Sequence, residues 1–195
     1  MNLRKLLGLQ KKPNENQPYP YEGILHLWED DYLMLELIAY ENLEFVKAET
    51  IRINDFAQEH FDGTSFTDIT PIGEKPIKTI EKLIDIADVE NIMTKAGLEK
   101  VSQFHMQGVG LVQGGKAQLG FGTNKFAIMC DKQSNLLQNI WVTGHTSNEE
   151  EKQKLIDALL LFGCTFNFIA VNWYRGEYYH LVERSSVVEF VTNSC

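Results

Sequence analysis

The most distinctive chemical feature of this sequence is a run of three acidic residues flanked by two aromatic residues. It consists of Trp28, Glu29, Asp30, Asp31 and Tyr32. Adjacent carboxylates can serve acid–base catalysis or bind a divalent cation, but consecutive side chains on a turn point in different directions and converge poorly. Tryptophan and tyrosine are enriched among the residues that anchor protein interfaces. We therefore predict that these five residues bind a partner, and the alternative is a solvent-exposed turn.

The histidines form no metal-binding pair. None of them occurs in an HxH, HExxH or HxxxH arrangement, so a metal site would need ligands from distant elements. The sequence also contains no GxSxG nucleophile motif. We therefore predict no catalytic residue, no metal and no cofactor. The alternative is a hydrolase whose site is assembled from scattered Asp, Glu and His. The five histidines are His26, His60, His105, His145 and His180.

Three cysteines, Cys130, Cys164 and Cys195, occur without a CxxC spacing. Because their number is odd, they suggest neither a disulfide framework nor a zinc site. Reduced thiols favour a cytoplasmic protein. Cys130 and Cys164 lie in apolar segments and are expected to be buried and inert, whereas the terminal Cys195 is expected to be exposed and the most reactive.

Glycines are concentrated between residues 108 and 122. They match neither GxGxxG nor GxxxxGK[ST], the two patterns of phosphate-binding loops. Tight hairpins and β-bulges account for them, and Gly114-Gly115 is the clearest turn signal. Another alternative function, a small-ligand-binding domain, would use these glycine-rich hairpins.

The acidic charge is concentrated in one segment. The chain has 27 acidic and 18 basic residues, and residues 22–62 alone hold eleven acidic and two basic ones. The excess in that segment therefore equals the net charge of the whole chain, −9. An acidic protein is a poor match for nucleic acid or for an anionic membrane surface, so neither is expected as a partner. The segment predicts an acidic surface that attracts a basic protein, the alternative being a solvated hairpin and helix face.

Hydrophobic periodicity predicts both strands and helices in the first half of the chain. Residues 24–38 are expected to form a hairpin whose turn is at 29–31. A helix at 42–60 and a strand at 66–70 follow. The next helix is expected at 77–97, with an interruption near Asp88.

The second half is predicted to follow a similar order. Its expected elements are a hairpin of strands 126–129 and 137–143, a helix at 147–162 with Ser147 as its cap and Gly163 at its end, and a strand at 165–173. Residues 186–192 fit either a short helix or a last strand. The similar order, at an offset of about one hundred residues, predicts two strand-strand-helix-strand halves or else reflects an arrangement common in α+β proteins.

These elements predict an α+β fold with antiparallel or mixed sheets and packed helices. Residues 1–21 are expected to be a tail or linker, because residues 10–21 are polar and contain three of the five prolines. Residues 22–195 are expected to form a single domain, in which 22–97 and 98–195 could be sub-halves.

In its size, its acidity, its apparent lack of catalytic motifs and its α+β order, the chain resembles the immunity proteins of bacterial toxin systems. That resemblance implies an acidic inhibitor of a basic toxin. The leading hypothesis is therefore a cytoplasmic binding protein without catalysis, an immunity-type inhibitor whose partner is a basic protein.

Overall fold

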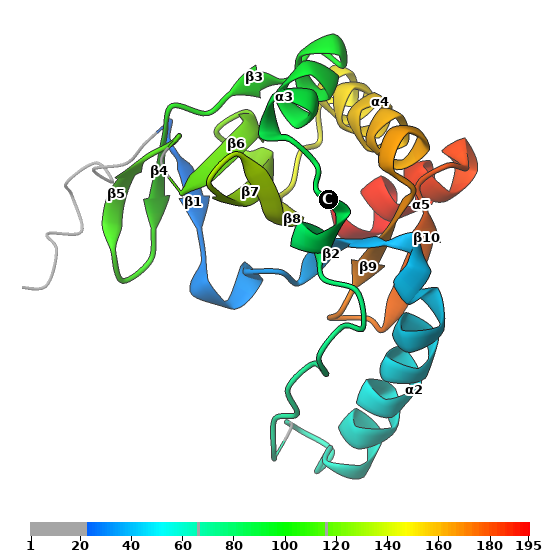
Figure 1. Ribbon diagram of the computed structural model, residues 1–195. Helices are drawn as coiled ribbons and strands as arrows, with labels where there is room; N and C mark the ends of the chain where they lie inside the picture. The colour runs from blue at the N-terminus through cyan, green and yellow to red at the C-terminus, as the bar shows by residue number, and fades with distance from the viewer. Residues whose placement is uncertain (1–22, 66, 116) are drawn as a thin grey trace, which may run out of the picture.

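The strand from Leu35 to Ala39 is central to the architecture, because all five of its residues are buried. A strand buried on both faces lies inside a sheet that other elements cover on either side. The computed structural model, which describes residues 23–65, 67–115 and 117–195, places this strand, β2, inside a seven-stranded sheet (Figure 1). The fold combines helices with one antiparallel and one mixed sheet, so the predicted α+β class is confirmed.

The large sheet is antiparallel throughout, and its strand order is β10-β9-β2-β8-β7-β6-β3. The hairpin of β7 and β8 is confirmed, although β7 extends into the segment that was expected to be the turn. The strands are β2 (Leu35–Ala39), β3 (Glu99–Lys100), β6 (Gln118–Gly122), β7 (Phe126–Gln133), β8 (Leu136–Gly144), β9 (Phe168–Asn172) and β10 (Glu177–His180).

Three helices cover one face of the large sheet and form the largest buried cluster with it. They are α3 (Ile86–Lys95), α4 (Glu149–Phe166) and α5 (Arg184–Ser194). The cap of α4 is Asn148, whose side chain accepts hydrogen bonds from the next backbone N–H groups, and not the predicted Ser147. The ambiguous residues 186–192 are helical, as part of α5.

Two separate elements cover the opposite face of the large sheet. Helix α2 (Leu43–Glu59) packs over β2 and β9, in a cluster that includes Val46 and Val171. A three-stranded sheet of β1 (Leu25–Leu27), β4 (Gln103–Met106) and β5 (Gly110–Gln113) packs over β7 and β8. In this small sheet β1 runs parallel to β4. Helix α2 and the small sheet therefore cover different parts of this face of the large sheet.

The predicted hairpin at 24–38 is wrong. Strand β1 pairs with β4 in the small sheet, whereas β2 pairs with β8 and β9 in the large one. The predicted turn is a short 3-10 helix, η1 (Glu29–Asp31), that connects the two sheets. The physical reason is that β2 is buried on both faces and so belongs inside a large sheet. There it pairs with a strand on each edge, β8 and β9, whereas a strand of an isolated hairpin pairs on one edge only.

The predicted strand at 66–70 is also wrong for the part that the structure describes, residues 67–70. Residues 67–69 are exposed, and no strand among the described residues pairs with them. The backbone N–H of Thr67 donates to the carbonyl oxygen of His60 instead. The helix predicted at 77–97 is two pieces, η3 (Thr79–Lys82) and α3, and the interruption precedes Asp85 instead of lying near Asp88. Leu83 there has a left-handed φ of 52°.

Because β1 and β2 lie in different sheets and the strand near 66 is absent from the described residues, the two halves do not share a topology. Their similar order is a coincidence of common α+β elements. The division into a tail at 1–21 and a single domain at 22–195 stays a prediction, since residues 1–22 lie outside the described part.

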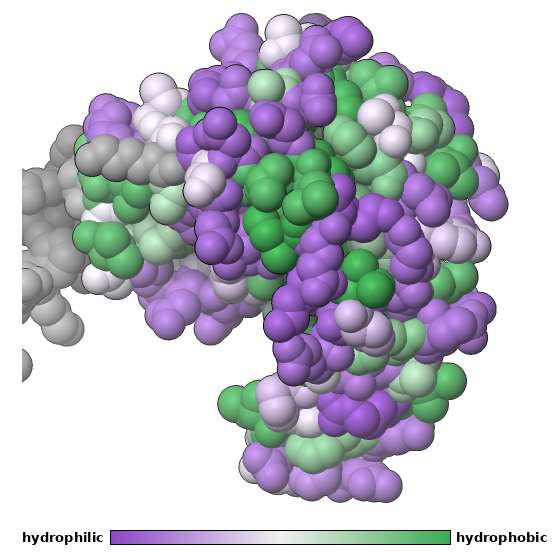
Figure 2. Space-filling view, viewed as in Figure 1, coloured by the Kyte–Doolittle hydropathy of each residue, from purple (hydrophilic) through white to green (hydrophobic). Residues whose placement is uncertain are grey.

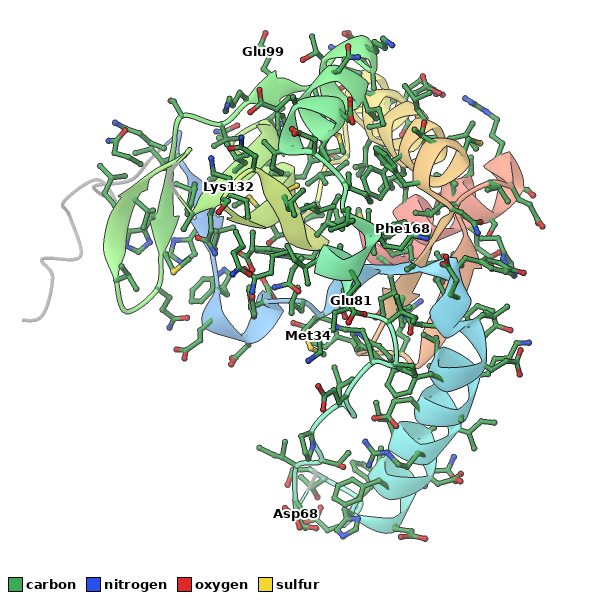
Figure 3. All side chains as sticks on the ribbon, in the orientation of Figure 1. Met34, Asp68, Glu81, Glu99, Lys132 and Phe168 are labelled. Carbon is green, nitrogen blue, oxygen red and sulfur yellow. The ribbon has the colours of Figure 1, made fainter. Side chains whose placement is uncertain are left out.

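Helix α2 and the segment after it form an arm that extends away from the sheets (Figure 1). Asp68 lies at the far end of this arm (Figure 3). The carboxylate of Glu49 accepts hydrogen bonds from Arg52 Nε at 2.9 Å and Nη2 at 2.6 Å, and Arg52 Nη2 also donates to the carbonyl oxygen of Pro71 at 2.7 Å. Figure 2 shows that the surface is hollowed between this arm and the small sheet.

None of the helices in the described residues is long and apolar enough to cross a membrane.

Candidate functional site

The acidic aromatic segment predicted to bind a partner borders a cavity of about 490 Å³ between η1 and the turn that follows β4. Trp28 is 55% exposed and Tyr32 is 44% exposed. We call this space the η1 cavity. Its described lining residues are Leu27, Trp28, Glu29, Asp31, Tyr32, Met106, Gln107, Gly108, Val109, Gln118, Trp141 and Thr143.

Contacts with the far edge of the large sheet hold η1 in place. The hydroxyl group of Tyr174 donates to Asp31 Oδ1 at 2.8 Å and lies 2.9 Å from the backbone carbonyl oxygen of Asp30. The backbone carbonyl of Met34, the residue before β2 (Figure 3), accepts a hydrogen bond from the backbone N–H of Trp173 at 2.9 Å. The carboxylates of the segment therefore sit on a connection that is held in place where it approaches β2.

The two exposed aromatic rings are also fixed. Tyr32 donates to Asp131 Oδ2 at 2.5 Å, and its ring meets that of Trp141 edge to face at 4.9 Å. Burial and the neighbouring Asp131 raise the pKa of Tyr32, so its hydroxyl stays protonated and remains a donor. The ring of Trp28 packs edge to face on His26, at 4.4 Å between centroids. Rigid aromatic surfaces lose little conformational entropy on binding.

All the charge among the described lining residues is negative. Glu29 and Asp31 are the charged residues of that set, and it includes no Lys, Arg or His. In a concave site partly shielded from water, two carboxylates produce a stronger field than they would on an open surface. The η1 cavity therefore favours a positively charged group.

Thr143, which also lines the cavity, carries a buried hydroxyl group. Strand alternation places it on the same face of β8 as Trp141, and it is 2% exposed. Within the described residues, its Oγ1 has no hydrogen-bond partner. A buried hydroxyl without a partner costs stability, so the unsatisfied group needs an explanation beyond packing.

The structure brings four of the five predicted residues to the cavity and leaves one beside it. Trp28, Glu29, Asp31 and Tyr32 line the η1 cavity, whereas Asp30 contributes its backbone carbonyl to the contact with Tyr174. Sequence reasoning missed Trp141 and Thr143, which are far away in the chain. It also missed the turn after β4, although Gly108 in the glycine-rich stretch was a usable signal.

The histidines do not converge on this cavity. His26 and His105 stack at 4.6 Å between centroids, with their Nδ1 atoms 2.8 Å apart, in the small sheet beneath Trp28. His60 lies at the end of α2, where its Nδ1 is 2.9 Å from the carbonyl oxygen of Phe56. Across the described residues, no group of three or more His, Cys, Asp or Glu side chains could hold a metal ion.

The expected environments of the cysteines are right for one residue and wrong for two. Cys130 is buried in β7, and burial raises the pKa of its thiol strongly. Cys164 is exposed, because it lies one position beyond Gly163 on α4, turned away from the packed side. Cys195 is half-buried rather than exposed, and burial raises its pKa to about 12.

Comparison with known proteins finds no matching family model, no matching curated protein and no matching solved structure. The function is therefore inferred from the geometry and charge of the η1 cavity.

Proposed function

We propose that this protein is a cytoplasmic binding protein without catalytic activity, and that it holds a basic protein partner at the η1 cavity. The observation that carries the proposal is the combination of exposed aromatic rings, from Trp28 and Tyr32, with the carboxylates of Glu29 and Asp31 in one concave site. Its three free cysteines support the cytoplasm as the compartment.

The two kinds of side chain have complementary roles in such a site. Aromatic anchors in a concave surface supply most of the binding energy of many protein interfaces. Acidic groups around them raise the association rate with a basic partner and reject acidic ones. Val109, which is exposed on the turn after β4, extends the apolar rim of the cavity. An inhibitor of a basic toxin, the narrower form of the hypothesis, would use the surface in the same way.

Affinity capture with charge variants tests the proposal. The wild-type protein and the Glu29→Gln/Asp31→Asn variant would be immobilised and exposed at low salt to an extract of the native cells. We expect the wild type to retain one or more proteins of high isoelectric point and to release them as salt rises, because salt screens the carboxylates. The variant is expected to lose them.

The matched control is Asp55→Asn/Glu59→Gln, which removes the same charge from two exposed positions on α2. It should retain the same proteins as the wild type. If the cavity variant also retains them, or if the control loses them equally, the partner does not bind at the η1 cavity and the proposal is wrong.

A further inference from the structure

We infer that the η1 cavity accepts a guanidinium group, the side chain of an arginine residue of the partner. This inference rests on the proposed function and specifies the chemical group that the site recognises. Three features of the cavity carry it: its aromatic walls, its acceptors and its unpartnered hydroxyl.

The aromatic walls suit a flat cation. The rings of Trp28 and Tyr32 are exposed and line the cavity. None of the described lining residues carries a positive charge. A guanidinium is planar and weakly hydrated, so it stacks on aromatic faces more readily than an ammonium group does. Because contacts with His26 and Trp141 hold the two rings, the walls are present before the ligand arrives.

The acceptors suit a group with many donors. The lining includes Glu29 and Asp31, whose side chains carry carboxylate oxygens, and Gln107 and Gln118, whose side chains carry amide oxygens. A guanidinium has five N–H donors in a fixed fork, whereas an ammonium group has three on a flexible stem. Tyr174 donates to Asp31 Oδ1, and within the described residues no hydrogen bond occupies Oδ2, the oxygen that a ligand would use.

Thr143 provides the independent indication of a ligand. Thr143 lines the cavity, and its hydroxyl oxygen is buried and has no hydrogen-bond partner in the described part of the chain. A hydroxyl kept there for packing alone would be better replaced by a methyl group of the same shape. An arginine N–H that reaches the floor of the cavity would satisfy it.

Small-molecule titration tests the inference without the partner protein. The probes are the N-acetyl amides of arginine, lysine and citrulline, the last of which keeps the shape of arginine and lacks its charge. Binding would be followed by tryptophan fluorescence and by NMR shifts of the indole N–H groups. We expect the arginine amide to bind most tightly, and the citrulline amide to bind about tenfold more weakly because charge-assisted hydrogen bonds are lost.

The Thr143→Val variant separates a binding role from a structural one. We expect it to be at least as stable as the wild type, because an unpartnered buried hydroxyl is removed, and to bind the arginine amide several-fold more weakly. Glu29→Gln/Asp31→Asn should abolish that binding, whereas Asp55→Asn/Glu59→Gln should leave it unchanged.

The inference and the proposed function fail in different ways. Equal affinity for the arginine and citrulline amides, or arginine binding that Thr143→Val does not weaken, would overturn the guanidinium assignment. Equal binding of arginine and lysine amides would overturn it as well. In each case the capture of a basic protein that depends on Glu29 and Asp31 could still succeed, since that experiment requires only that the partner is cationic.

Discussion

Tyr174 and Asp31 are 143 residues apart in the chain, and the tyrosine hydroxyl donates a hydrogen bond to the aspartate Oδ1 at 2.8 Å. This contact ties the turn between β9 and β10 to η1, so that the far edge of the large sheet positions a carboxylate of the η1 cavity. Burial raises the pKa of Tyr174, and the neighbouring Asp31 raises it further, so the hydroxyl stays a donor across the physiological range.

The first prediction concerns Tyr174→Phe, which removes only this hydroxyl. We expect several-fold weaker binding of the basic partner, because Asp31 and the carbonyl of Asp30 lose their common donor. The contact is exposed, so the free energy of unfolding should fall by only about 0.5 kcal/mol. Binding would be measured by surface plasmon resonance and stability by urea denaturation. Tyr40→Phe, at the other end of β2, is the control, and equal affinity of the two variants would contradict the positioning role of Tyr174.

The second prediction concerns the ion pair at the base of the arm. Lys75 Nζ lies 2.6 Å from Glu36 Oε1, and Trp173 Nε1 donates to the other oxygen at 3.2 Å. Glu36 is almost completely buried, so breaking the pair leaves its carboxylate without a counter-ion, with the hydrogen bond from Trp173 as the remaining compensation. Lys75→Met should lower the free energy of unfolding at pH 7 by about 3 kcal/mol, the lower end of the range for such pairs, since Lys75 is partly exposed.

The pH dependence of this effect has a definite sign. Burial raises the pKa of Glu36 in the folded state, and Lys75 opposes that shift. A carboxyl group with a raised pKa favours folding below its unfolded pKa and loses that contribution as pH rises through the folded pKa. The stability of Lys75→Met should therefore fall more steeply from pH 5 to pH 8 than that of the wild type. The double variant Glu36→Gln/Lys75→Met should lose this extra dependence of stability on pH. If its stability declines as steeply as that of Lys75→Met, a group other than Glu36 causes the decline.

The parts of the fold that could be predicted are those whose pattern is local. The β7–β8 hairpin has two apolar runs around one polar turn, and α2 and α4 have apolar residues at helical spacing. The 24–38 segment has the same local pattern as a hairpin. Its strands pair instead with β4, β8 and β9, which are distant in the chain, and no local signal distinguishes the two outcomes.

The candidate site was predictable in the same partial way. The composition of residues 28–32 indicated a binding segment, because aromatic and acidic residues stand together there. Trp141 and Thr143 could not be assigned to it, since they come from a strand that also supplies core residues such as Val142. Only the pairing of β7 with β8 and the packing of the small sheet bring them to the η1 cavity.

The third prediction concerns the thiols. The exposed Cys164 should react with a maleimide in the native state far faster than the other two cysteines, because Cys130 is buried and burial raises the pKa of Cys195 to about 12. A thiol with a raised pKa has little of the reactive thiolate. The rates would be followed by mass spectrometry of peptides after timed labelling. Cys164→Ser should remove the fast phase, and a fast phase that persists would place the reactive thiol elsewhere.

The last prediction follows from a glycine whose role the sequence did not reveal. Gly163 was expected to end the second long helix, but α4 continues to Phe166 and is closed by Asn167, whose φ is a left-handed 60°. Gly163 instead lies where α4 meets Leu181, between β10 and α5. A Cβ atom added to Gly163 would lie 2.2 Å from the Cβ of Leu181 and 2.7 Å from its carbonyl oxygen.

Helix propensity and packing therefore predict opposite effects for Gly163→Ala. Replacing glycine by alanine inside a helix should stabilise the protein by about 1 kcal/mol on propensity alone, whereas overpacking of a tight contact costs about 1–3 kcal/mol. The contact with Leu181 includes backbone atoms that cannot simply rotate away, so we expect the packing cost to exceed the gain. The free energy of unfolding should fall, as measured by urea denaturation. Thr165→Ala, on the exposed side of the same helix, changes helix propensity without the contact with Leu181. Its free energy of unfolding should not fall by a similar amount. A rise in stability for Gly163→Ala would mean that α4 and Leu181 are not in close contact.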